Sequence, residues 1–395
     1  MIEMYLRVII DLAMFFGLFV ITAIALNFQY GNAGVPNMGC AVSVSIGGFT
    51  VSMIVTRIVF WIGEQAGIAI LPHTSNYDWI YNNQLNVYMM NDFLRKNAFM
   101  SVALFIFSIA LGFVFGWAFG YIISLPAIRL RATYLIITLI TLCDTVQIIS
   151  RNIVPITGGT LGMYIPDMFA WFPGDRGIIM VAITLFIGLF GFFIFKTMIN
   201  SPYGRLMRAV RENPDTVNSI GKDVTNIRRN VLMFASGMTA IVGVLVTYYY
   251  SFCIGSNFLR TTWTYWPWLM LMIGGPGNNT GTLLGCIIII SMRRLIMLFK
   301  WQLESVLFYP ISLFENQLLG AILLAILIFR PNGLIPEKSL NLPGINYQQL
   351  ITEITDVDWR VIRRAPPTKK VQTKFREILH RFKFWEKRSE ERVRH

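Results

Sequence analysis

Long apolar runs constrain this chain more than any other feature of its sequence. Several of them exceed the roughly 18–20 residues that a helix needs to cross the hydrocarbon core of a bilayer. The runs are continuous and lack the polar–apolar alternation of membrane barrel strands. Charged residues make up only 14% of the 395 residues, against about 25% in a typical soluble domain. The sequence therefore predicts an all-α polytopic membrane protein with about eight to ten transmembrane helices.

Basic residues are concentrated in two stretches of the chain, whose net charge is +13. Residues 196–229 hold seven Lys or Arg against three Asp or Glu, and residues 330–395 hold fifteen against eight. Because segments rich in Lys and Arg stay on the cytoplasmic side of a membrane, we expect both stretches in the cytoplasm. Topology thus accounts for the basic character, and we expect contact with membrane lipid rather than with nucleic acid.

Two short helices are predicted in the first basic stretch, between two apolar runs. Ser201 is a good N-cap for a helix with Pro202 at its first position, and Asn213 with Pro214 repeats this signal. Gly221 is a typical helix stop. The sequence therefore predicts a compact helix-turn-helix on the membrane surface.

Charged side chains fall on one side of the first of these helices. Arg205, Arg208 and Glu212 occupy positions i, i+3 and i+7, so they share a face. A rigid, charged helix on the membrane surface suits contact with another protein. The alternative is that its arginines only follow the positive-inside rule and contact lipid headgroups.

The chain divides into residues 1–336, predicted as the transmembrane domain, and residues 337–395, predicted as a basic cytoplasmic tail. Within the domain, residues 63–96 form a polar insertion with only two basic residues, so we expect it outside the cell. An apolar stripe predicts an amphipathic helix in the tail, for an anionic membrane surface or a partner subunit. Its residues are Val371, Phe375, Ile378, Phe382 and Trp385.

Several apolar runs contain residues that perturb a simple helix. The Gly-rich stretches Tyr30–Thr50 and Gly274–Gly281 predict broken or re-entrant segments or, for the first, simple tight packing. Asp11 and Asp144 place acids within apolar runs, and Asp11 lies near one end, so we interpret it as interfacial.

Two further features concern packing and topology. Gly112, Gly116 and Gly120 recur at four-residue spacing, which favours close contact with another helix. Arg293 and Arg294 follow an apolar run that, counted along the chain, ends on the external side. That position is against the positive-inside rule, and the alternative is that these arginines belong to an amphipathic interfacial helix through Leu307.

Cysteine and histidine residues are scattered. The four cysteines lie far apart with no C-x-x-C spacing, so we expect free, packed thiols, and the three histidines suggest no metal site. The first apolar run lacks a small-residue cleavage site, so we interpret it as a retained span. The chain contains no G-x-x-x-x-G-K-[ST] loop for a nucleotide.

One segment resembles a known family. Ser201–Glu212 reads S-P-Y-G-R-L-M-R-A-V-R-E, which is similar to the S-P-[FY]-G-R-x-[LM]-R-A-[IV]-R-E motif of permease subunits of branched-chain amino-acid ABC importers. Further similar patterns are Gly221, Val224 and Arg228, T-G-G at Thr157–Gly159 with Gly162, L-M-L-M-I-G-G-P-G at Leu269–Gly277, R-P-N-G-L-I at Arg330–Ile335, and Arg129–Tyr134 with Ala132 in place of the usual Gly. Asp144 stands ten residues after Tyr134, where the family often has Glu. The insertion and the tail depart from the family's pattern.

The resemblance implies the fold of an ABC-importer transmembrane domain and a set of partners. This chain would be a transport subunit rather than an enzyme, in a prokaryotic cell (inner) membrane. It would pair with a second permease subunit, either itself or a sibling. Two ATPase subunits would bind ATP and Mg²⁺ below it, and an extracytoplasmic substrate-binding protein would dock above it.

Two groups of functional residues are expected, one for coupling and one for the substrate path. The expected ATPase-coupling residues are Ser201, Pro202, Gly204, Arg205, Arg208, Ala209, Arg211, Glu212 and Gly221. The expected translocation-path residues are Asp144, Thr157, Gly158, Gly159, Gly274, Gly275, Gly277, Gly47 and Gly48. Asp144 would face a substrate ammonium group, and exposed N–H groups at the glycines would face its carboxylate. The alternative for Asp144 is a hydrogen bond between helices.

The expected substrates are branched-chain or other hydrophobic amino acids. Urea or short amides are an alternative, because related permeases carry them. An ion-coupled secondary transporter is an alternative of a different class. It would need coupling carboxylates near the middle of the membrane, and it would leave the charged helix-turn-helix without a role.

Overall fold

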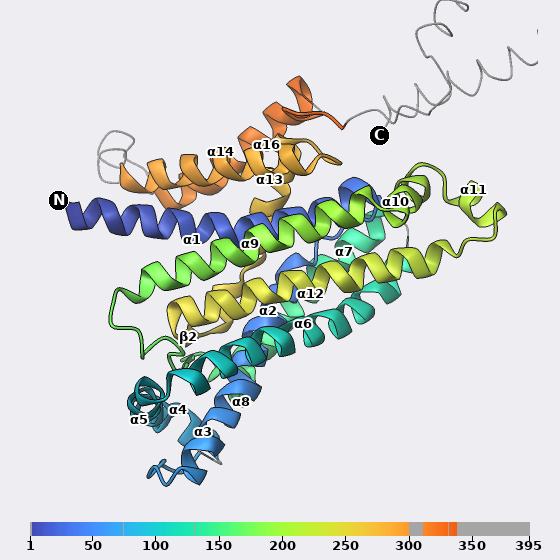
Figure 1. The fold of residues 1–395 in the computed structure, drawn as a ribbon. Helices are drawn as coiled ribbons and strands as arrows, with labels where there is room; N and C mark the ends of the chain where they lie inside the picture. The colour runs from blue at the N-terminus through green and yellow to red at the C-terminus, as the bar shows by residue number, and fades with distance from the viewer. Residues whose placement is uncertain (1, 74, 131, 300–310, 331, 338–395) are drawn as a thin grey trace, which may run out of the picture. The chain divides into compact units, whose positions relative to one another are not determined.

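The computed structural model describes residues 2–73, 75–130, 132–299, 311–330 and 332–337, and these form an almost entirely helical bundle (Figure 1). The long helices are α1 (Ile2–Leu26), α6 (Ala98–Arg129), α7 (Ala132–Asn152), α9 (Arg176–Asn200), α12 (Val224–Tyr250), α14 (Asn279–Leu298) and α16 (Ile311–Phe329). The amphipathic helix predicted in the tail lies outside the described residues.

Seven described segments are long and apolar enough to cross a membrane. They are 7–32, 40–65, 98–127, 133–152, 176–200, 224–250 and 279–298. The sequence predicts about eight to ten such helices, and the nineteen-residue α16 and the nine-residue α13 (Trp266–Gly274) are apolar helices that are not among the seven. The prediction of a polytopic, all-α membrane protein is confirmed.

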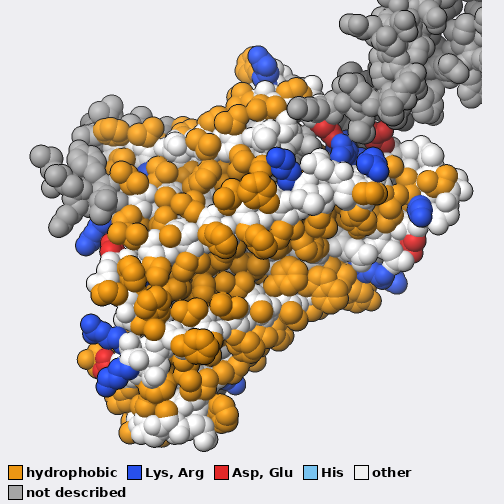
Figure 2. All heavy atoms as spheres, viewed as in Figure 1, with side chains coloured by type: hydrophobic (Ala, Val, Ile, Leu, Met, Phe, Trp, Pro, Cys, Tyr) orange, Lys and Arg blue, Asp and Glu red, His pale blue; other side chains and the backbone are white. Residues whose placement is uncertain are grey.

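The distribution of side chains on the surface fits a membrane environment. Figure 2 shows hydrophobic side chains over the middle of the visible face, along the long helices. Most of the visible charged side chains lie toward its left and right ends. A bilayer would therefore cover the apolar middle and leave both charged ends in water.

Helix α12 forms the centre of the bundle, where it packs against α6, α1 and α2 (Cys40–Thr50). Small residues allow this close packing. A Cβ added to Gly116 would overlap the Cβ of Ala240, and one added to Gly47 would fall on the Ala240 carbonyl oxygen. The close helix contact predicted from the four-residue glycine spacing on α6 is confirmed.

Three helical segments change to π-helix, and one of them overlaps the first Gly-rich stretch. Segment η1 (Asn27–Asn32) ends α1, and η2 (Val51–Val55) joins α2 to α3 (Thr56–Gln65). Segment η4 (Thr261–Tyr265) precedes α13. Helix α13 ends at the glycine turn, where Gly275 has a φ of +109°. Of the two Gly-rich stretches, Tyr30–Thr50 therefore holds the end of η1 and the regular helix α2, and Gly274–Gly281 holds the turn between α13 and α14.

The two ends of the bundle carry different elements (Figure 1). One end, here called the α10 end, carries α10 (Pro202–Glu212) and α11 (Pro214–Ser219). The other, here called the β1 end, carries a two-stranded antiparallel pairing of β1 (Met163–Tyr164) with β2 (Phe252–Cys253).

The insertion of residues 63–96 is folded at the β1 end. It contains α4 (Asn76–Tyr81), α5 (Asn83–Lys96) and the short segment between α3 and α4. The Asn83 Oδ1 atom accepts a hydrogen bond from the Tyr164 amide at 2.7 Å, and the Asn91 Oδ1 atom accepts one from the Asp167 amide at 2.7 Å. These bonds attach the insertion to β1 and to the segment that follows it. Helix α8 (Val154–Thr157) and the 3-10 helix η3 (Gly255–Phe258) complete the described elements.

Candidate functional site

Local capping groups set the bounds of α10 and α11. The Ser201 Oγ atom accepts a hydrogen bond from the Gly204 amide at 3.4 Å, and the Asn213 Oδ1 atom accepts one from the Thr216 amide at 3.1 Å. Proline follows each cap within the first turn. Gly221 has a φ of +75°, which suits the turn that follows α11. The predicted pair of capped helices is confirmed.

Helix α10 has one face turned to solvent and one packed on the bundle. Its exposed residues are Pro202, Arg205, Ala209 and Glu212. Its buried residues are Gly204, Met207 and Val210. A Cβ on Gly204 would fall on the carbonyl oxygen of Ile199, so only glycine allows this contact with the end of α9. The outward face is thus a short stripe with an arginine and a glutamate on either side of an alanine.

Two of the expected coupling arginines do not belong to this outward face. The Arg208 Nη2 atom donates to the carbonyl oxygen of Ile199 at 2.9 Å. Arg211 donates through Nη1 to the carbonyl oxygen of Gly31, and its Nη2 atom lies 2.8 Å from Glu337 Oε2. Only about a quarter of either side chain in this ion pair is exposed. Arg211 therefore joins α10 to η1 and to the segment that follows α16.

Buried polar side chains continue this connection from η1 to the glycine turn after α13. The Asn27 Oδ1 atom accepts a hydrogen bond from the Gly277 amide at 2.8 Å, and its Nδ2 atom donates to Asn279 Oδ1 at 2.7 Å. The Asn32 Nδ2 atom donates to the Asn27 carbonyl oxygen at 3.1 Å. We call Arg211, Gly31, Glu337, Asn27 and Gly277 the α10-end node.

The glycine turn Gly274–Gly277 lies at the α10 end, and it is closed by other parts of the chain. The Leu334 amide donates to the Ile273 carbonyl oxygen at 2.8 Å, and the Ile335 amide donates to the Gly274 carbonyl oxygen at 3.1 Å. The amide of Gly277 is already bonded to Asn27, as described above. The role of Gly274, Gly275 and Gly277 in a translocation path stays a prediction.

The expected path glycines at Gly47 and Gly48 lie inside α2 and are buried. Their backbone is helical, so the exposed N–H groups suggested by the sequence are not present in this conformation. Gly47 allows close contact with α12, and a Cβ on Gly48 would overlap the ring of Phe258. Small residues in an apolar run indicate close packing as readily as they indicate an exposed backbone.

The T-G-G segment shapes a loop at the β1 end. The Thr157 Oγ1 atom donates to the Ser150 carbonyl oxygen at 2.7 Å. Gly158 and Gly159 have φ values of +76° and +66°, which residues with a Cβ rarely adopt. These residues fold the connection between α8 and β1, and their contribution to a path stays a prediction.

Asp11 and Asp144, the two acids that the sequence analysis places within apolar runs, are each paired with an arginine. Asp144 on α7 forms an ion pair with Arg260, the residue before η4. Asp11 on α1 forms an ion pair with Arg294 on α14 at 2.8 Å and accepts a hydrogen bond from the Tyr249 hydroxyl group. This second pair gives the Arg294 side chain of α14 an acidic partner within the fold.

Sequence reasoning missed these arginine partners because they are distant in the chain. Arg260 is 116 residues from Asp144, Arg294 is 283 residues from Asp11, and Glu337 is 126 residues from Arg211. No local spacing pattern links residues so far apart. An unpaired acid in an apolar run was the one available signal, since it implies a partner somewhere in the fold.

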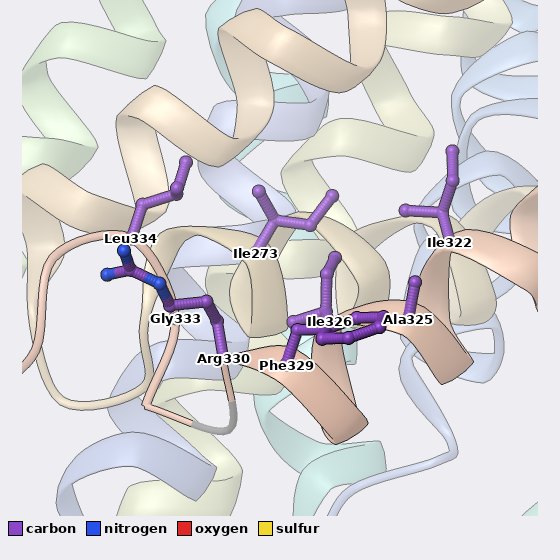
Figure 3. Close-up of a pocket in the computed structure, with 8 residues that line it drawn as sticks. All are labelled: Ile273, Ile322, Ala325, Ile326, Phe329, Arg330, Gly333 and Leu334. Carbon is purple, nitrogen blue, oxygen red and sulfur yellow. The ribbon is translucent and has the colours of Figure 1, made fainter.

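A cavity of about 270 Å³ lies between α13, α16 and the segment that follows α16 (Figure 3). Its lining residues are Ile273, Ile322, Ala325, Ile326, Phe329, Arg330, Gly333 and Leu334. Arg330 is the one charged side chain in this lining. Because the lining has no acid to pair with an ammonium group, we do not place an amino-acid substrate there.

The fold and the exposed α10 helix define a multi-pass membrane protein with a charged helical element at one end. Residues 8–329 match the family described as the permease component of the branched-chain amino acid transport system. The chain belongs to this family.

Named relatives agree with this assignment. The chain is 33% identical over 334 residues to a probable branched-chain amino acid transport permease protein, LivM, of Methanocaldococcus jannaschii. That match covers 84% of this chain and 94% of the relative. The chain is 23% identical over 244 residues to high-affinity LivM permease proteins of Salmonella typhimurium and Escherichia coli, covering 55% of this chain and 54% of each relative. No solved structure matches the chain significantly.

Proposed function

We propose that this chain is the permease subunit of an ABC importer for branched-chain or other hydrophobic amino acids. Separate ATPase subunits would bind ATP and Mg²⁺ and supply the energy. The family and the names of the relatives support the substrate class. The observation that carries the coupling role is the outward stripe of α10, which presents Arg205, Ala209 and Glu212 at one end of the bundle.

The α10 end faces the cytoplasm in this proposal, together with the basic tail. The excess of basic residues in 196–229 supports this orientation. The β1 end then lies outside the cell, where residues 63–96 would meet an extracytoplasmic substrate-binding protein. A second permease subunit would complete the path.

The two faces of α10 have different roles. The outward stripe docks into a groove of the ATPase, where the small Ala209 side chain allows close approach between two charged residues. The inward arginines connect the same helix to the membrane segments. Arg208 holds the end of α9, and Arg211 holds η1 and Glu337. Movement of the ATPase subunits would thus be transmitted to α1 and to the glycine turn through the contacts of the α10-end node.

An ion-coupled carrier is disfavoured by the ion pairs of Asp11 and Asp144. Such a carrier needs carboxylates that bind a coupling ion near the middle of the membrane. Asp11 and Asp144 are instead each neutralised by an arginine. The arrangement therefore supports a path driven by a partner ATPase.

Charge reversal on the outward stripe tests the docking role. In Arg205→Glu, we expect co-purification of the ATPase subunits and ATP-driven uptake to fall about tenfold or more, the effect of losing roughly 1.4 kcal/mol of binding. The matched control is Lys222→Glu, which makes the same charge change at an exposed residue outside α10. Unchanged co-purification and uptake in Arg205→Glu would remove the docking role.

Two companion variants separate the two faces of α10. Arg211→Gln and Glu337→Gln each remove the ion pair of the α10-end node and leave the outward stripe unchanged. We expect the ATPase subunits to bind and hydrolyse ATP, while uptake per ATP falls severalfold. Loss of ATPase binding in Arg211→Gln would show that Arg211 contacts the ATPase directly.

A further inference from the structure

Helix α7 carries polar residues in the middle of a membrane span. We call Thr138, Thr141, Asp144 and Thr145 the α7 polar patch. Thr141 and Thr145 are exposed, and the other two are half-buried. The patch is centred on the middle of the 21-residue helix. The lipid surroundings of a span are most apolar at that depth, so a helix facing lipid would have apolar residues there.

Another helix of the same bundle shows what a lipid-facing surface looks like. The exposed residues of α9 at positions i, i+3, i+4 and i+7 are all large and apolar. They are Phe186, Leu189, Phe190 and Phe193. Helix α7 is even less buried than α9, with 22% of its span covered against 33%. Helix α7 also exposes apolar residues toward both ends, such as Ile137 and Ile148, so the polar residues at its middle are what distinguish its surface from that of α9.

The ion pair at the patch is open to the outside of the described fold. The side chain of Asp144 is 45% exposed, and that of Arg260 is 37% exposed. Charged side chains in membrane spans almost always face a water-filled cavity or other protein. A surface with this pair and two exposed hydroxyl groups fits the wall of a polar path better than it fits a lipid contact.

Arg260 is also well placed for an anionic group. It precedes the continuous helical segment formed by η4 and α13, residues 261–274. The start of a helix carries a partial positive charge, which adds to that of the guanidinium group. Gln147, three residues after Asp144 on α7, has a buried Nε2 atom with no hydrogen-bond partner among the described residues.

We propose that Asp144 and Arg260 recognise the zwitterionic backbone of an amino acid by exchanging partners. The ammonium group of the substrate binds Asp144, its carboxylate binds Arg260, and the internal ion pair re-forms when the substrate leaves. The inference rests on the proposed importer function and adds Arg260, the partner exchange and the recognised group.

This exchange has a physical advantage in a membrane. With no substrate, the two protein charges neutralise each other, so the path contains no isolated charge. With substrate, one ion pair is replaced by two, and each charge of the amino acid obtains a partner. The threonine hydroxyl groups beside the pair donate to carbonyl oxygens of their own helix at 2.8–3.2 Å. They present weak acceptors that would not retain the substrate.

The test uses the complete transporter, with its ATPase subunits, in proteoliposomes. The variants are Asp144→Asn, Arg260→Gln and the two combined. Uptake is measured for leucine and for leucinamide, an analogue in which an uncharged amide replaces the carboxylate. Co-purification of the ATPase subunits is measured in parallel. We expect each single variant to lower leucine uptake about tenfold or more while the complex assembles. Arg260→Gln should also abolish the preference for leucine over leucinamide.

The double variant distinguishes recognition from a structural ion pair. If the pair only holds helices together, removing both charges leaves no unpaired charge and should restore uptake. In the partner exchange, the double variant stays as defective as the single variants. Wild-type uptake in the single variants, or recovery in the double variant, would overturn the proposal.

Two controls complete the design. Asp11→Asn neutralises the acid of the other intramembrane pair and should retain the preference for leucine over leucinamide. If the neutral variants do not assemble, Asp144→Glu and Arg260→Lys replace them, because these variants keep the charges. Each should raise the KM for leucine. An unchanged KM would overturn the proposal. Absence of ATP-driven uptake in the unmodified complex would instead reject the importer function itself.

Discussion

Helices α12 and α7 are both long and apolar enough to cross a membrane, yet their surroundings are opposite. In α12, 94% of the span is buried within the described fold, against 22% in α7. Helix α12 lies between α6, α2 and α1, whereas α7 lies at the surface with an open ion pair. Hydropathy therefore identifies a span but does not say what surrounds it.

The difference follows from the residues that face outward from each helix. Helix α12 has small residues where its neighbours approach, such as Ala240 and Gly243. A Cβ on Gly243 would fall on the Val44 carbonyl oxygen of α2. Helix α7 instead has threonines and a charged pair. Small residues allow other helices to pack, and polar residues require water or another protein.

The largest expected effect comes from adding one methyl group at the α2–α12 contact. In Gly47→Ala, the new Cβ overlaps a backbone oxygen, which cannot move away as a flexible side chain can. We expect a loss of about 3 kcal/mol, near the upper end for overpacking. The measurement is the thermal unfolding midpoint of the purified permease.

Gly320→Ala is the matched control for that substitution. Gly320 lies in α16, and a Cβ there would meet open space. We expect no loss of stability and a gain of up to about 1 kcal/mol from helix propensity. Equal losses in the two variants would show that the α2–α12 contact is less close than described.

An accessibility measurement sharpens the other half of the comparison. In the assembled transporter, we expect Thr141→Cys on α7 to react with a water-soluble thiol reagent. We expect Leu189→Cys on the apolar face of α9 to react at least about tenfold more slowly, since a thiol in lipid does not ionise. The four native cysteines are buried, which keeps background labelling low. Similar rates at the two positions would show that α7 faces lipid.

The parts of this fold that were predictable depend on local signals. The cap bonds of α10 and α11 join residues three positions apart, so Ser201 and Asn213 predicted both helices. The division of α10 into two faces was only partly predictable. Arg205 and Glu212 point outward as their spacing indicates, but Arg208 and Arg211 bond to distant backbone and to Glu337.

Contacts between distant segments account for what sequence reasoning missed. The expected exposed amides at Gly47 are part of a buried helix, because glycine permits both arrangements and the approach of α12 selects one. The interfacial interpretation of Asp11 omitted Arg294, which the fold of α14 brings to within 2.8 Å. Such pairings depend on how whole helices cross, and no single run of residues encodes that.

The smallest expected effect concerns hydroxyl groups within α12. The Oγ atom of Ser236 is buried with no hydrogen-bond partner among the described residues, whereas Thr247 Oγ1 donates to the Gly243 carbonyl oxygen at 2.8 Å. Ser236→Ala removes an unpartnered polar group and improves helix propensity. We therefore expect an unchanged stability or a gain of up to about 1 kcal/mol.

Thr247→Val is the comparison variant, because it removes the hydrogen bond to the Gly243 carbonyl oxygen and should cost about 0.5–1.5 kcal/mol. The contrary result is a lower unfolding midpoint for Ser236→Ala than for Thr247→Val. It would mean that the surroundings of α12 are more polar than the helices packed around it indicate, and so more like the surface of α7.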